Sequence, residues 1–212
     1  MFSRHELVWL TGRGWDAVLQ RALAGQHEGI EHWRRENWPA VVRRPDVGLV
    51  PGQVSLGIPL PPTPDGVKGR IALNAFEIEV AERRPALALQ DAARAAPGQW
   101  RPALDALAAR LPLQAYGSLA MQAITGQTYL TPSSDIDLLF FPAAAKALHD
   151  GLAVLEEHAA ALPLDGEIVF PSGAAVAWKE WLNASRNDAR VLVKEAGAVR
   201  LAPMADLLAS LA

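Results

Sequence analysis

Strand and helix patterns alternate from Leu113 to the end of the chain, and this alternation limits the possible fold more than any other feature. Short apolar runs bounded by turn residues are typical of buried strands, whereas apolar residues spaced three or four apart are typical of helices. Strands are predicted at LQAYGS, SDIDLLFF and GEIVF, and in a hairpin, VLVKEAGAVRLA, that turns at Gly197. Helices are predicted at LAMQAITG, AAAKALHDGLAVLEEHAAAL and AVAWKEWLNA, and from Met204 onwards. This order predicts an α+β domain with a mixed sheet flanked by helices.

The first third of the chain has a different character. A stretch rich in proline and glycine, from Pro45 to Leu73, excludes long helices and favours short strands joined by turns. One such strand is expected from Gly69 to Leu73, after the turn sequence PTPDG. Helical patterns are seen at residues 15–23, at residues 85–96 and from Trp100 onwards. We therefore predict a small β-rich N-terminal domain over residues 1–84, which would bind substrate or partner, and a second domain over residues 85–212.

Composition narrows the class of protein. The chain has 212 residues, no cysteine and a net charge of −3. The lack of cysteine excludes disulfide scaffolds, thiolate zinc sites and cysteine nucleophiles. The charge gives no basic field for nucleic acid or a membrane surface, so an anionic ligand must be met by local basic residues. Charged residues near the N-terminus argue against a signal peptide, and no window approaches the roughly 20 apolar residues of a membrane span. A soluble, cytoplasmic protein is expected.

Two carboxylates, Asp135 and Asp137, precede the apolar run LLFF. Residues two apart in a strand share a face, and here they are separated by about 7 Å at roughly 3.3 Å per residue. A pair at this distance can hold hard cations, and Mg²⁺ typically combines one or two carboxylates with substrate phosphates. Taken alone, the pattern is more typical of a solvated entrance to a buried strand.

Two further sequence features favour phosphate chemistry. Gly117-Ser118 lies between a predicted strand and a predicted helix, where glycine admits a ligand, Ser118 can cap the helix, and the exposed amides attract anions. Glu167 begins the next apolar strand and can supply a third carboxylate, although an exposed acid at a strand edge is an equally good interpretation. Three signals in this order favour metal-assisted phosphoryl or nucleotidyl transfer.

This order of motifs resembles the nucleotidyltransferase fold of the polymerase beta type. The resemblance implies that the acids bind two divalent ions and that the Gly-Ser turn binds the leaving phosphates. A closer resemblance is carried by YGSLAMQAITGQTYLTPSSDIDLLF and LDGEIVFPSGAAVAWKEW, together with RHELVWL, WPAVVRRPD and KGRIAL. These strings are similar to the phosphoribosyl-dephospho-CoA transferases of the malonate decarboxylase system, over nearly the whole chain.

The closer resemblance implies an activity and a set of site residues. The activity is transfer of the triphosphoribosyl-dephospho-CoA prosthetic group to a serine of the apo acyl carrier subunit, with release of pyrophosphate. Mg²⁺ is the expected cofactor, with Asp135, Asp137 and Glu167 as its ligands. Glu167 or a metal-bound hydroxide is the expected acceptor of the serine proton.

Basic residues must meet the charge of such a substrate. Lys68 and Arg70 are the preferred candidates because Gly66 and Gly69 let a phosphate approach the backbone, and Lys179 is a third. Arg43 and Arg44 are further candidates, and each of these residues is also typical of a solvated surface. Tryptophans could stack on adenine, but at helical spacing they are more often core residues: Trp33, Trp38, Trp178 and Trp181.

Two alternatives stay open. One is a nucleotidyltransferase that acts on another hydroxyl, either of a small molecule or of a protein tyrosine. The other is a non-catalytic member of the fold that binds a nucleotide or a protein partner. Retention of Asp135, Asp137 and Glu167 argues weakly against the second alternative.

Overall fold

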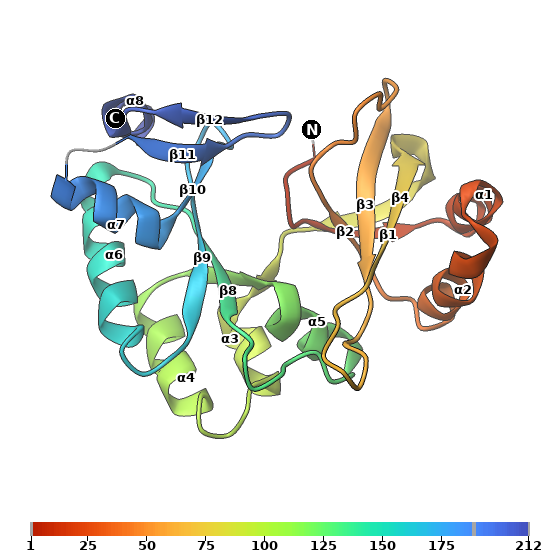
Figure 1. Ribbon diagram of the computed structural model, residues 1–212, viewed down its shortest axis with the longest axis horizontal. Coiled ribbons are helices and arrows are strands. Elements are labelled where there is room, and N and C mark those ends of the chain that lie inside the picture. The colour runs from red at the N-terminus through yellow and green to blue at the C-terminus, as the bar shows by residue number, and fades with distance from the viewer. Residues whose placement is uncertain (1, 188–189, 212) are drawn as a thin grey trace. The chain divides into compact units, whose positions relative to one another are not determined.

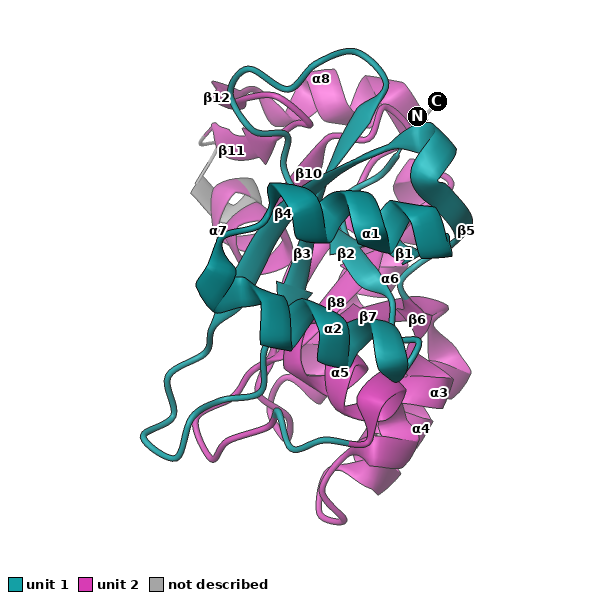
Figure 2. Cartoon of the chain, turned by 90° about the vertical axis from the view of Figure 1, so that its right-hand side faces the viewer, with its two compact units in different colours: residues 1–86, 127–129 teal, residues 87–126, 130–212 magenta. Residues whose placement is uncertain are grey.

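The computed structural model describes residues 2–187 and 190–211, which fold into two compact units (Figures 1 and 2). Unit 1 consists of residues 1–86 and 127–129, and unit 2 of residues 87–126 and 130–212. The boundary falls slightly later than the sequence predicts, and the return of residues 127–129 to unit 1 is not predicted at all. Tyr129 explains this return, because its side chain is buried and its hydroxyl donates to the main-chain carbonyl of Pro59 at 2.8 Å. Each unit combines one sheet with helices, which confirms the α+β class.

Unit 1 is built on a five-stranded antiparallel sheet in the order β4-β3-β2-β1-β5. Its strands are β1 (Leu7–Leu10), β2 (Ala40–Val42), β3 (Gln53–Pro59), β4 (Arg70–Phe76) and β5 (Val80–Arg84). Its helical segments are α1 (Gly12–Arg21), η1 (Ala24–Gln26), α2 (His27–Arg35) and η2 (Glu77–Glu79). Figure 1 shows α1 and α2 together beside this sheet.

The proline-rich stretch forms strands, as expected, but they are longer than predicted. β3 and β4 pair along their whole lengths, from Gln53 opposite Phe76 to Pro59 opposite Arg70. Every second residue of β4 from Ile71 onwards is buried, so one face of this strand packs in the core. β1 was not predicted, because its sequence LVWL is a short continuous apolar run that periodicity cannot distinguish from a helix.

Trp33 belongs to the core of unit 1, and Trp38 is half-buried and packs against it. The Trp33 side chain is 1% exposed, and its indole N–H donates to the carbonyl of Pro39 at 2.9 Å. The two rings meet edge to face with 4.9 Å between their centroids. The core interpretation is therefore confirmed for Trp33.

Unit 2 is built on a seven-stranded sheet in the order β12-β11-β10-β9-β8-β7-β6. Neighbouring strands are antiparallel except for β8 and β9, which are parallel and are joined through α6. The strands are β6 (Leu87–Ala88), β7 (Leu113–Tyr116), β8 (Ile136–Phe140), β9 (Leu164–Val169), β10 (Ala175–Ala177), β11 (Val191–Lys194) and β12 (Val199–Ala202). The helical segments are α3 (Leu89–Ala92), η3 (Ala93–Ala95), α4 (Arg101–Arg110), α5 (Gly117–Thr125), α6 (Ala145–His158), α7 (Trp178–Asn187), α8 (Met204–Leu208) and η4 (Ala209–Leu211).

Most of the predicted alternation in unit 2 is confirmed, with two corrections. The hairpin around Gly197 is formed by β11 and β12, which pair from Val191 opposite Ala202 to Lys194 opposite Val199. The helix predicted at residues 85–96 is instead the short strand β6 followed by one turn of α3 and the η3 segment. The helix predicted from Ala175 begins only at Trp178, because residues 175–177 form β10 and pair with β9.

The sheet of unit 2 has one face packed in the core. On β8, Ile136, Leu138 and Phe140 are buried in the same hydrophobic cluster as Trp178 and Trp181 of α7. Figure 1 shows α6 and α7 on one side of β8 to β10. At Gly151, α6 comes so close to β8 that an added Cβ would overlap the ring of Phe140.

The opposite face of this sheet, which we call the site face, carries the intervening side chains. Because side chains alternate along a strand and paired residues point the same way, this face is set by the register. Its members on β8 to β11 are Asp137, Leu139, Asp165, Glu167, Val169, Ala175, Ala177, Leu192 and Lys194. Within the described ranges, no helix combines the length and apolar character that crossing a bilayer requires.

Candidate functional site

Asp137 is the central acidic residue of the site face. It is the second residue of β8, half-buried, and it pairs with Tyr116 of β7 on one side and Asp165 of β9 on the other. Asp135 directly precedes the first residue of β8 and is exposed. The two carboxylates thus lie at the start of a strand whose remaining residues are buried, as the sequence pattern indicates.

The Gly-Ser turn lies directly against Asp137. β7 ends at Tyr116 and α5 begins at Gly117, which has a φ of +66°, in the left-handed region that favours glycine. A Cβ on Gly117 would overlap the Oδ2 atom of Asp137, so the carboxylate occupies space that only glycine leaves open. The N-cap of α5 is Tyr116, which corrects the expectation that Ser118 caps this helix. Ser118 lies in the first turn and is 8% exposed.

Glu167 lies on the same face as Asp137, one strand away. It pairs with Leu139 of β8, and its side chain is 4% exposed. The Nζ atom of Lys194 on β11 donates to its Oε1 atom at 2.8 Å. The structure therefore places the third predicted acid on the same face of the sheet, with a lysine already bound to its carboxylate.

Asp165 is an acidic residue of the site that the sequence interpretation missed. It pairs with Asp137 across the parallel β8–β9 ladder, and its side chain is 45% exposed. Lys179, the basic residue of α7 predicted to contact substrate, has its Nζ atom 4.0 Å from the Oδ1 atom of Asp165. The predicted strand began at Gly166, one residue too late. The sequence Asp165-Gly166-Glu167, with acids two residues apart, is a pattern that predicts both carboxylates on one face of the strand.

The acidic residues of this face carry oxygen atoms of the kind that a divalent cation prefers as ligands. Among the residues that the structure describes, no three acidic, histidine or cysteine side chains gather closely enough to hold a metal ion. Mg²⁺ needs only one or two protein carboxylates when substrate phosphates and water complete its shell. Asp135 and Asp137 can provide these, since the Asp137 carboxylate lies in the space left open at Gly117.

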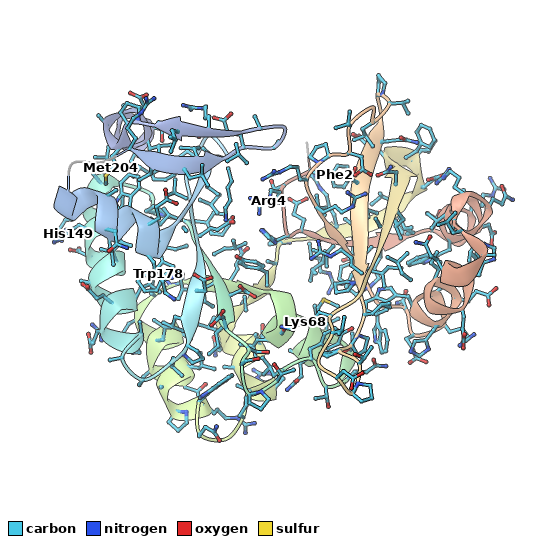
Figure 3. All side chains as sticks on the ribbon, viewed as in Figure 1. Phe2, Arg4, Lys68, His149, Trp178 and Met204 are labelled. Atoms are coloured by element: carbon cyan, nitrogen blue, oxygen red, sulfur yellow. The ribbon has the colours of Figure 1, made fainter. Side chains whose placement is uncertain are left out.

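The remaining candidate bases, Lys68 and Arg70, belong to unit 1. Lys68 lies in the loop between β3 and β4 (Figure 3), and Arg70 is the first residue of β4. Both are exposed, and the aliphatic part of Arg70 crosses Gly57, where a Cβ would lie 3.0 Å from its Cδ atom.

Arg43 has a structural role, because its guanidinium makes two 2.5 Å hydrogen bonds to the Asp46 carboxylate and lowers the pKa of that group.

Other side chains considered from the sequence lie outside the site. Trp178 and Trp181 are each 3% exposed and pack in the core of unit 2, so they do not offer a stacking surface. Figure 3 marks Trp178 at the start of α7 and His149 on α6. His158 ends α6, with its Nδ1 atom 2.9 Å from the carbonyl of Val154. Both histidines are therefore helix residues, as the sequence indicates.

Comparisons with known proteins give matches that span the chain. Residues 3–86 match the family model described as phosphoribosyl-dephospho-CoA transferase MdcG N-terminal domain, and residues 87–205 match the corresponding C-terminal domain. The division between these matches coincides with the division of the structure at residue 86.

Relatives named phosphoribosyl-dephospho-CoA transferase support the same family. One from Xanthomonas campestris pv. campestris (strain 8004) is 40% identical over 210 residues, covering 96% of this chain and 95% of the relative. Another, from Bradyrhizobium diazoefficiens, is 36% identical over 186 residues, covering 84% of this chain and 81% of the relative. No solved structure matches the chain, so the polymerase-beta-type arrangement stays a prediction.

Proposed function

Because this chain belongs to the phosphoribosyl-dephospho-CoA transferase family, a family of enzymes, we propose that it modifies the apo acyl carrier subunit of malonate decarboxylase. The proposed donor is triphosphoribosyl-dephospho-CoA, and the acceptor is a serine hydroxyl of the carrier. The serine oxygen forms a bond to the phosphorus next to the ribose, the bond from that phosphorus to pyrophosphate breaks, and the serine proton is released. The proposed place of action is the cytoplasm.

One observation supports transfer at a phosphate above the others, namely the contact between the Gly117 turn and the Asp137 carboxylate. The turn puts main-chain N–H groups at the start of α5 beside the Asp137 carboxylate. Amides at a helix start attract phosphate, whereas carboxylates attract the cation that accompanies it. A site with both features fits a polyphosphate donor better than it fits an uncharged ligand.

We propose that Asp135 and Asp137 hold Mg²⁺ at this site. When bound, Mg²⁺ neutralises charge on the phosphate under attack and on the departing pyrophosphate. The chain itself provides orientation: Gly117 leaves room for the Asp137 carboxylate, and β8 fixes the direction of that side chain. Ser118, in the first turn of α5, and Lys179, near Asp165, are proposed to contact substrate phosphates.

Glu167 stays a prediction as a third metal ligand or as acceptor of the serine proton. In either role its carboxylate must share or release Lys194, which is bound to it at 2.8 Å. Lys68 and Arg70 stay predictions as phosphate contacts. We propose that unit 1, to which they belong, binds the remainder of the donor or the carrier.

The proposed function predicts pyrophosphate release that depends on the acceptor. With triphosphoribosyl-dephospho-CoA and Mg²⁺, the protein is expected to release one pyrophosphate for each apo carrier subunit modified, and the carrier gains the mass of the prosthetic group. A carrier whose acceptor serine is replaced by alanine is the matched control and should give no release. Continued release with the alanine carrier, or release only with a small-molecule hydroxyl or a tyrosine peptide, would favour another acceptor. Nucleotide binding without any release would indicate a non-catalytic member of the fold.

A further inference from the structure

Lys194 and Glu167 form an ion pair that crosses a whole strand. The Nζ and Oε1 atoms are 2.8 Å apart, although the residues lie on β11 and β9 with β10 between them. The β10 residues that pair with them are Ala175, opposite Lys194, and Ala177, opposite Glu167. Because these residues carry only methyl groups, the lysine side chain can extend over β10 to the carboxylate.

The two partners are buried to very different degrees. The Glu167 side chain is 4% exposed, whereas that of Lys194 is 32% exposed. Removing a carboxylate from water is costly, and a buried ion pair recovers this cost only in good geometry, so such pairs are weak stabilising devices. What the pair does achieve is a fixed position for an ammonium group. That group has three donors, of which the hydrogen bond to Glu167 uses one, and the side chain that carries it is partly exposed, so it can donate to a second acceptor.

The ammonium is held on the same face of the sheet as Asp137 and Asp165. Asp137 and Glu167 lie on adjacent strands that are about 5 Å apart, and their offset of two residues adds about 7 Å along the strand. Lys194 therefore shares a face with these acids and is paired with the most buried of them. Asp135, Asp137 and Asp165 all repel a phosphate group, and a cation fixed on the same face offsets part of this repulsion.

We propose that Lys194 binds a phosphate of the polyphosphate donor and that Glu167 is the positioning residue that holds it there. This inference deepens the proposed function and rests on it. It assigns different tasks to the acids of the site face: Asp135 and Asp137 hold the metal, and Glu167 orients a phosphate-binding lysine. The alanines of β10 are part of the arrangement, because larger side chains would block the path from β11 to β9.

The test compares variants by their affinity for magnesium pyrophosphate, measured by titration calorimetry on the full chain. Lys194→Met alone would remove the lysine from a buried carboxylate and is expected to destabilise the protein. The informative variant is therefore the double replacement Lys194→Met/Glu167→Gln, which removes both charges. Lys146→Met is the matched control, since Lys146 is an exposed residue of α6, on the core side of the sheet.

The double variant is expected to bind pyrophosphate roughly tenfold to hundredfold more weakly, because it loses a hydrogen bond to a charged group. Lys146→Met is expected to leave the affinity unchanged, and Lys194→Arg to retain most of it. Glu167→Gln alone is expected to weaken pyrophosphate binding while the magnesium concentration needed for half-saturation stays the same. Unchanged pyrophosphate affinity in the folded double variant would overturn the inference. A raised magnesium requirement in Glu167→Gln, with pyrophosphate affinity intact, would also overturn it and make Glu167 a metal ligand.

Failure of the proposed function looks different in the same set of experiments. Wild-type protein that binds pyrophosphate through Lys194 but modifies no carrier would contradict the acceptor and leave the phosphate site standing. If the wild-type protein modifies the carrier and the double variant binds pyrophosphate as tightly as the wild type, only the assignment of Lys194 as a phosphate-binding residue would be contradicted.

Discussion

Replacement of Asp137 by asparagine is expected to lower the rate of carrier modification about a thousandfold. A bound metal ion stabilises transition-state charge by several kcal/mol, and each 1.36 kcal/mol lost lowers the rate about tenfold. The side chain keeps its size, so it still fits the space beside Gly117, but the amide is a weaker ligand for a hard cation. The measurement is pyrophosphate release with the apo carrier at saturating magnesium.

The same variant is expected to stay folded. Asp137 has acidic neighbours in Asp135 and Asp165, so neutralising it relieves repulsion when no metal is present. The free energy of unfolding of the metal-free protein should therefore change by no more than about 1 kcal/mol and can increase. Asp105→Asn, at an exposed position of α4, is the control and should leave both activity and stability unchanged. Full activity in Asp137→Asn, or a large loss of stability, would contradict this assignment.

Replacement of Gly166 by alanine is expected to give the largest loss of stability in unit 2. Gly166 lies between Asp165 and Glu167 in β9, with a φ of +133°, and pairs with Leu138. A Cβ there would overlap the main chain of Leu138 in the neighbouring parallel strand. Strain at such a φ costs about 1 to 3 kcal/mol, and displacement of a backbone adds to it, so a loss of about 4 kcal/mol or failure to fold is expected.

Gly173→Ala separates the two contributions to this loss. Gly173 also has a positive φ, +83°, but an added Cβ there would meet nothing within 4 Å. It should therefore show only the conformational cost, about 1 kcal/mol or slightly more. Denaturant unfolding of both variants, followed by circular dichroism, measures the difference. Equal losses in the two variants would show that the close approach of β9 to β8 is not important for stability.

Much of unit 2 could be predicted from the sequence because its elements have clear local signals. The apolar run after Asp137 predicts β8, and Gly197 between two alternating segments predicts the β11–β12 hairpin. Gly117 was also identified correctly as a turn between strand and helix. In each case the local pattern and the tertiary environment favour the same structure.

The parts that could not be predicted depend on contacts between distant residues. β10 consists of Ala175 to Ala177, a sequence that suits a helix, and it becomes a strand because β9 and β11 supply partners on both sides. The ion pair of Glu167 with Lys194 joins two residues that nothing in the local sequence connects. Asp165 was missed because the start of β9 is defined by its pairing with β8.

The most direct test of the central claim is a measurement of metal binding at the aspartates. Mn²⁺ can replace Mg²⁺ as the probe, and its binding is followed by electron paramagnetic resonance in the presence of pyrophosphate. We expect the wild-type protein and Asp105→Asn to bind Mn²⁺ equally, and the Asp135→Asn/Asp137→Asn variant to bind it at least about tenfold more weakly, since both proposed ligands are lost. Wild-type affinity for Mn²⁺ in the folded double variant would contradict the account.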